Sequence, residues 1–90
     1  MTRLADEGQI LVTQRAAEQY ADAARLGVEE ARRELTVVLL DAHRVAGDTE
    51  TPERWRARSR TLGIDVSARV VRQDGLLVVV GCSRRTIPCR

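Results

Sequence analysis

The chain has 90 residues, of which 43% are hydrophobic, 31% charged and only 2% aromatic, and its formal net charge is +2. This length predicts one domain, and the hydrophobic content argues against a chain that is disordered throughout. There is no run of about 18 apolar residues and no apolar stretch near the start, so we expect neither a membrane-spanning helix nor a secretory signal, but a cytoplasmic protein.

The first elements predicted are a flexible segment and a short strand. Residues 1–8 are polar and are expected to be flexible, so that a single folded domain covers residues 9–90. The apolar run at residues 9–12 predicts a strand.

Two helices are predicted next. Thr13 is a suitable N-cap for a helix over residues 14–26, and Gly27 is expected to close that helix. A second helix is predicted over residues 28–46, because apolar residues recur there at intervals of three and four. His43 would then lie in its last turn, where a positive charge complements the helix dipole.

The C-terminal half is predicted to form antiparallel strands. Residues 48–61 are interpreted as a connection, with an edge strand over residues 54–60 as an alternative. Strict alternation of apolar and polar residues predicts a half-buried strand over residues 64–73. Asp74-Gly75 favours a two-residue hairpin turn, and the apolar run that follows predicts a central strand covered on both faces, within residues 76–82.

This order predicts an α+β fold: a strand, two helices, and then an antiparallel β-hairpin in a small sheet. Val37 and Leu40 lie off the apolar stripe of the second helix, and such a sheet has exposed edges. We therefore expect a bound partner or a homodimer.

Charge is distributed unevenly along the chain. Residues 1–50 hold 6 arginines and 10 acidic residues, a net charge of −4, whereas residues 51–90 hold 9 arginines and 3 acidic residues, a net charge of +6. A basic surface is typical of proteins that bind phosphate, although the two halves could instead pair with each other. Every cation is arginine and lysine is absent, which we attribute to a GC-rich genome of a bacterium or phage.

The first candidate site is the row of arginines at residues 54–60. If this segment is extended, Arg54, Arg56, Arg58 and Arg60 share one face and could follow a phosphate backbone, while Trp55 could stack on a base. The alternative is a solvated connection with Trp55 in the core.

The second candidate site lies at the far end of the hairpin. A two-residue turn at Asp74-Gly75 places Asp65 opposite Arg84 and Ser67 opposite Cys82, with Arg69 on the same face. These groups could bind an anion, or Asp65 and Arg84 could form an ordinary cross-strand ion pair.

Further chemistry is sparse. His43 is the only histidine and the natural proton acceptor, although its predicted place at a helix end has a structural explanation. Cys82 and Cys89 are expected to be reduced thiols, and the sequence contains no zinc signature or Gly-rich phosphate loop, so neither metal nor cofactor is predicted.

The order of elements resembles the RelE/ParE superfamily of small bacterial toxins. The matching segments are residues 10–13 leading into the first helix, residues 66–71 with Arg69, residues 78–81, and the basic pair Arg84 and Arg85. The resemblance implies a sheet that cradles and cleaves mRNA at the ribosome or, in the ParE branch, binds gyrase, and it implies an antitoxin as partner.

Two functions follow as expectations. The first is a toxin-type module that binds RNA or the translation machinery, with Arg69, Arg84, His43 and Asp65 as candidate catalytic residues and Arg85 among those that bind. The sequence offers no clear general base, so ribonuclease activity is left open. The alternative is a non-enzymatic protein from a phage or plasmid that binds a host protein and inhibits or redirects it.

Overall fold

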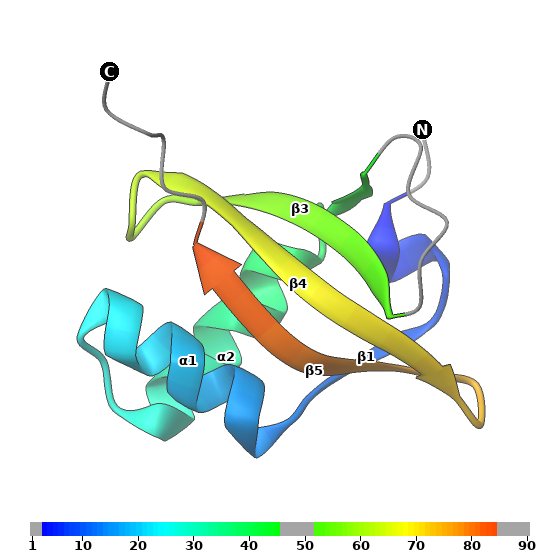
Figure 1. Cartoon of the computed structure of the whole chain (residues 1–90), viewed down its shortest axis with the longest axis horizontal. Helices are drawn as coiled ribbons and strands as arrows, with labels where there is room; N and C mark the ends of the chain where they lie inside the picture. The colour runs from blue at the N-terminus through cyan, green and yellow to red at the C-terminus, as the bar shows by residue number, and fades with distance from the viewer. Residues whose placement is uncertain (1–2, 46–51, 85–90) are drawn as a thin grey trace.

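The chain forms a five-stranded sheet with two helices on one of its faces (Figure 1). The computed structural model describes residues 3–45 and 52–84. In chain order the elements are η1 (Leu4–Asp6, a 3-10 helix), β1 (Gln9–Val12), α1 (Gln14–Ala24), α2 (Val28–Leu39), β2 (His43–Arg44), β3 (Glu53–Ser59), β4 (Ile64–Gln73) and β5 (Leu76–Arg84).

The sheet is mixed, with the strand order β1-β5-β4-β3-β2. β1 pairs with β5 in parallel, and every other neighbouring pair is antiparallel. The predicted α+β fold is therefore confirmed, and its layout is consistent with that of RelE/ParE-like domains. Among the described residues, no helix has the length and apolar character needed to cross a membrane.

The first helix begins as predicted but ends differently. The Thr13 side chain accepts a hydrogen bond from the Ala16 amide at 3.3 Å, which caps α1. The helix is closed by Arg25 in the left-handed conformation (φ 58°), and Gly27 is instead the N-cap residue of α2. The prediction that Gly27 closes the first helix was therefore wrong.

The second helix is shorter than predicted, because α2 ends at Leu39 and not at residue 46. Ala42 is still fully buried, so its apolar spacing fits a turn as well as a helix. The carbonyl of Ala42 accepts a hydrogen bond from the amide of Leu4 at 2.8 Å, and Leu4 is itself fully buried within a segment expected to be flexible. His43 consequently lies in β2 and not at a helix end.

The arginine-rich segment is a strand. β3 replaces most of the connection predicted at residues 48–61, and it lies between β4 and β2 instead of at an edge. Trp55, Ala57 and Ser59 are buried on the helix side. The extended alternative is therefore the one that the structure adopts.

The hairpin turn forms at Asp74 and Gly75, whose φ angles are 51° and 79°. The expected register holds near the turn, where Val71 faces Val78. An irregularity in the pairing then shifts the register by one residue, so that Arg69 faces Gly81. Beyond this bulge, the predicted cross-strand pairs were wrong.

The core lies between the helices and the inner face of the sheet, with Tyr20, Leu35 and Trp55 as its large members. Leu77 and Val79 of β5 point into this core, whereas Val78 and Val80 are half-buried on the opposite face. The central strand is therefore covered on one face only, contrary to the prediction. We call the uncovered side the open face.

Candidate nucleic-acid interface

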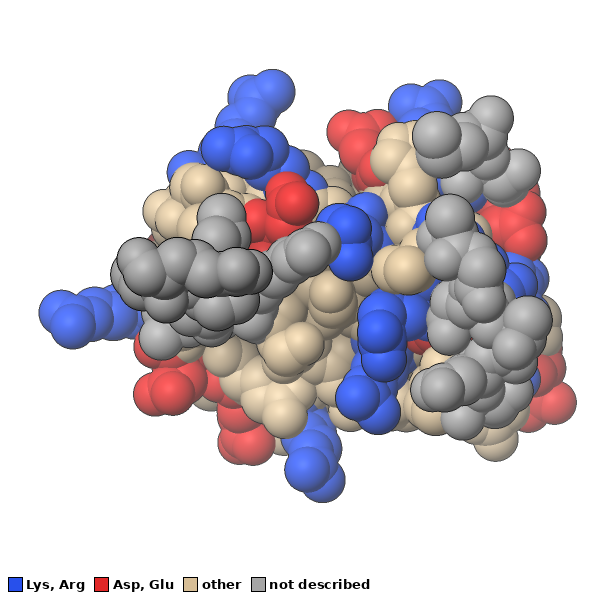
Figure 2. Space-filling view, turned by 45° about the horizontal axis from the view of Figure 1, so that its top comes forward, with Lys and Arg blue, Asp and Glu red and all other residues tan. Residues whose placement is uncertain are grey.

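The open face carries a hollow whose lining is largely basic. This central hollow has a volume of about 390 Å³ and is lined by Arg54, Arg56, Ser67, Arg69 and Ser83. Figure 2, which brings the top of Figure 1 forward, shows arginine side chains gathered over the middle of the molecule. The two strands β3 and β4 place these arginines next to one another, since Arg54 is directly opposite Arg69.

The β-bulge determines what accompanies these arginines. Because the register shifts by one residue, Ser67 faces Ser83, and Cys82 faces Ala68 on the helix side. Cys82 packs against the core, where burial raises the pKa of its thiol to about 11. The hollow therefore offers two hydroxyl groups beside its cations, in place of the thiol expected from the sequence.

Two of the arginines in this hollow have no carboxylate partner within the described part of the chain. Arg56 and Arg69 form no ion pair there, and Nε of Arg56 is buried without a hydrogen-bond partner. Glu34 of α2 accepts hydrogen bonds from Tyr20 and Thr61, and Glu29 pairs with Arg32 of its own helix. Pairing between helix acids and sheet arginines, the alternative raised by the charge distribution, does not account for these two.

Two further hollows adjoin the central one. The hollow beside α1, of about 530 Å³, shares Arg69 and Ser83 with it and adds Arg15 and Gln19. The edge cavity, of about 1000 Å³, shares Arg56 and lies between α2 and the outer edge of β3. A chain of hollows thus runs across the strands, and arginines line each part of it.

The edge cavity brings together several residues that the sequence singled out. His43 faces Arg56 across β2 and β3, and Asp65 faces Arg58 across β3 and β4. An Arg58 guanidinium nitrogen lies 4.0 Å from a carboxylate oxygen of Asp65, and the backbone of Arg84 is opposite Val66 instead of Asp65. Arg60 also lines this cavity.

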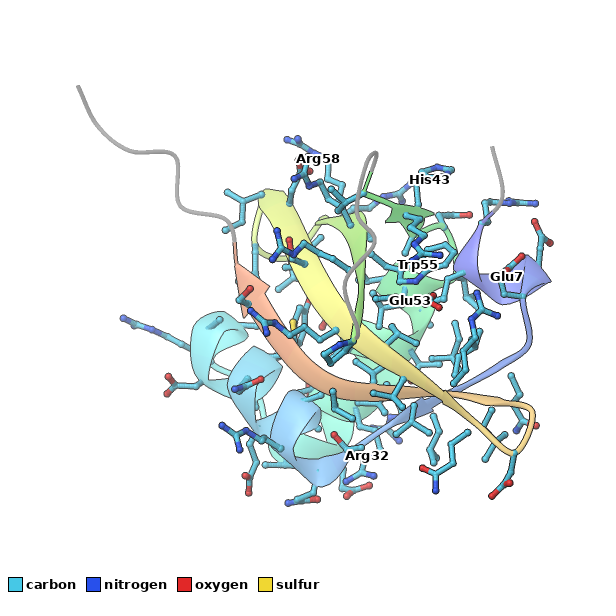
Figure 3. The ribbon with its side chains drawn as sticks, turned by 45° about the vertical axis from the view of Figure 1, so that its right-hand side comes forward. Glu7, Arg32, His43, Glu53, Trp55 and Arg58 are labelled. Atoms are coloured by element: carbon cyan, nitrogen blue, oxygen red, sulfur yellow. The ribbon has the colours of Figure 1, made fainter. Side chains whose placement is uncertain are left out.

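Trp55 is not available to a base on the open face. Its side chain is 2% exposed, and its indole Nε1–H donates to a Glu53 carboxylate oxygen at 3.1 Å. Arg72 donates to Glu53 at 2.9 Å and to Glu7 at 2.7 Å. The hydrogen bond between Arg72 and Glu53 is the main reason why the pKa of Glu53 is lowered. Figure 3 shows Trp55 and Glu53 side by side, with Glu7 close to them.

A buried polar cluster that the sequence analysis missed supports the turn after β3. The hydroxyl of Tyr20 lies 2.7 Å from the hydroxyl of Ser59 and donates to a Glu34 carboxylate oxygen at 3.0 Å. Thr61 donates to the same oxygen, and the amide of Leu62 donates to Ser59. Burial is the main reason why the pKa of Tyr20 is raised. The only signal in the sequence is a lone tyrosine on an apolar helix face.

The remaining candidates contribute little that can be placed. The backbone of Arg84 pairs with Val66, and Arg85 and Cys89 lie outside the described residues. Residues 3–45 and 52–84 contain no group of three or more histidine, cysteine or acidic side chains that could hold a metal ion.

Comparisons with models of protein families, with curated proteins and with solved structures find no match to this chain. What the molecule itself establishes is a small α+β fold with a mixed five-stranded sheet.

Proposed function

We propose that this protein binds single-stranded RNA across the open face of its sheet, as a RelE/ParE-like module would. The observation that carries the proposal is the pair Arg56 and Arg69, which line the central hollow without a carboxylate partner among the described residues. Cations in that position favour a polyanion, since a bound phosphate would offset the repulsion between neighbouring guanidinium groups.

The surface also favours backbone contacts over recognition of bases. Trp55 is buried and Tyr20 is in the core, so no aromatic side chain of the described residues is free to stack on a base there. The expected binding is therefore weakly selective for sequence and strongly dependent on salt. If about three phosphates are neutralised, affinity for a single strand falls roughly 20-fold for about a fourfold increase in salt.

Titration of a fluorescent oligouridine at two salt concentrations tests the proposal. Arg69→Glu should weaken binding at least about tenfold, because it places a carboxylate in the central hollow. Arg33→Glu is the matched control, since it changes the net charge equally on the exposed surface of α2 and should have little effect.

Weak, unsaturable curves for the wild type and both variants would refute RNA binding. The same arginines would then have to serve an acidic protein partner, which is the non-enzymatic alternative.

Cleavage of the bound RNA is a second candidate activity, and one observation favours it. His43 and Asp65 both line the edge cavity together with Arg56 and Arg58. In such a reaction the 2′-hydroxyl attacks the adjacent phosphorus as a base removes its proton, the 5′-oxygen leaves with a proton from an acid, and a cyclic phosphate remains. Intact RNA after prolonged incubation with wild type would exclude this activity; cleavage that persists in His43→Ala would exclude His43 as its proton acceptor.

A further inference from the structure

The outer edge of β3 is only partly covered by β2. β2 pairs with Trp55 and Arg56, and no described residue pairs with β3 beyond that point on the same side. The carbonyl of Arg54 accepts a hydrogen bond from the amide of Val45 on the β2 side at 3.0 Å. Because alternate residues of a strand direct their backbone groups to the same neighbour, the N–H and C=O of Arg58 face this uncovered edge.

An apolar wall faces the uncovered edge from α2. Val37 is 64% exposed, which is unusual for a large apolar side chain in this protein. Val37 and Val38 line the edge cavity together with Ala57 of β3. A strand laid along β3 would therefore direct alternate side chains onto this wall.

The opposite side of the same cavity is cationic. Arg56 and Arg60 have no carboxylate partner within the described residues, and His43 lies beside Arg56. The acidic residues that line the cavity already have partners: Glu34 accepts from Tyr20, Asp41 pairs with Arg3, and Asp65 pairs with Arg58. Side chains that point away from the apolar wall would therefore meet unpaired positive charge.

We propose that the edge cavity binds an extended segment of a partner protein, in which apolar and acidic residues alternate, as an additional strand on β3. Main-chain hydrogen bonds to Arg58 would hold the segment, the apolar side chains would cover Val37, and the carboxylates would pair with Arg56 and Arg60. A second copy of this chain is disfavoured, because two such edges would bring their arginines together. RNA would contact only the cationic side of this cavity, where His43 lies, because the apolar wall offers no group that binds phosphate.

Amide hydrogen exchange, measured by NMR on the full chain, tests this inference. The probe is an acetylated octapeptide of alternating valine and glutamate, and the control peptide replaces glutamate by lysine. The valine–glutamate peptide should bind saturably and slow exchange of the Arg58 amide at least about tenfold, because that amide enters a strand hydrogen bond. The lysine peptide should do neither.

Three variants separate this site from the RNA site. Val37→Gln keeps the net charge and should weaken peptide binding about tenfold. Arg33→Gln, on the same helix, should leave peptide binding unchanged. Arg69→Glu should weaken binding of oligouridine at least about tenfold and leave binding of the peptide unchanged. Unprotected Arg58, or equal affinities for Val37→Gln and wild type, would overturn the inference. Protection of Arg58 by oligouridine instead of the peptide would also overturn it, and would extend the RNA site to this edge.

Discussion

Replacing Tyr20 by phenylalanine tests how much the buried polar cluster contributes to stability. The tyrosine is 1% exposed, and its hydroxyl lies 2.7 Å from Ser59 and 3.0 Å from Glu34. Phenylalanine preserves the ring and its packing but removes the hydroxyl. Glu34 keeps its bond from Thr61, and Ser59 keeps its bond from Leu62, so neither partner is left completely unsatisfied.

The expected loss follows from the two hydrogen bonds. A neutral hydrogen bond contributes about 1 kcal/mol, and one to a charged group about 1.5–3 kcal/mol. Glu34 is partly exposed, so its contribution belongs at the lower end of that range. We therefore expect Tyr20→Phe to lower the free energy of unfolding by about 2 kcal/mol, and the melting temperature by roughly 10 °C.

The assay is urea unfolding followed by the emission of Trp55, which is the only tryptophan and is 2% exposed. Ser59→Ala and the double variant complete a thermodynamic cycle, with an expected coupling of about 1 kcal/mol. Glu18→Gln, on the exposed surface of α1, is the control and should change stability by less than about 0.5 kcal/mol. If Tyr20→Phe behaves like this control, or if the two substitutions are additive, the cluster does not stabilise the fold as argued.

Three further predictions concern other parts of the molecule. The pKa of Glu53 is held below its ordinary value of 4.5 mainly by its hydrogen bond with Arg72. The Glu53–Arg72 pair therefore stabilises the fold above that pH, and this stabilisation is lost as the pH falls through the lowered pKa. Arg72→Met should reduce the difference in urea midpoint between neutral pH and about pH 3. Burial raises the pKa of the Cys82 thiol to about 11, so its alkylation by iodoacetamide at about pH 8 should be far slower than that of a cysteine in a short unstructured peptide. Mass spectrometry follows both reactions, and equal rates would contradict the burial of Cys82. Gly75 has a φ of 79°, and a Cβ atom at this position would meet open space within 4 Å, so Gly75→Ala should cost about 1 kcal/mol in urea unfolding from backbone strain alone.

Local signals predicted the elements whose structure is decided locally. Thr13 caps α1 because its side chain reaches the first turn, and Asp74-Gly75 forms the hairpin turn because both residues tolerate positive φ. The alternation that ends at Val70 predicted which face of β4 is buried, with Val66 and Val70 almost completely enclosed. None of these features requires knowledge of distant residues.

Features that depend on distant partners were not predicted. Helix α2 ends early because the backbone after it bonds to η1 and to β3, as Ala42 and Val45 do. The shifted register of β5 is matched by a hydrogen bond from the amide of Cys82 to the side chain of Gln19 in α1, at 2.8 Å. The candidate site depends on that shift, because it brings Ser83 opposite Ser67. The row of arginines, by contrast, was found from the sequence, because its spacing of two residues is a local pattern.

The pairing of the first strand with the last has a consequence for how the molecule folds. β1 pairs with residues 76–79, and the carbonyl of Val79 also accepts hydrogen bonds from Thr13. β5 lies in the interior of the sheet, so α1 and α2 have no complete surface to pack against until it is in place. Contacts so distant in sequence slow folding. On the ribosome, the N-terminal half must remain unfolded or held by a chaperone until β5 has emerged, and a fragment that lacks β5 should aggregate through the apolar faces of its helices.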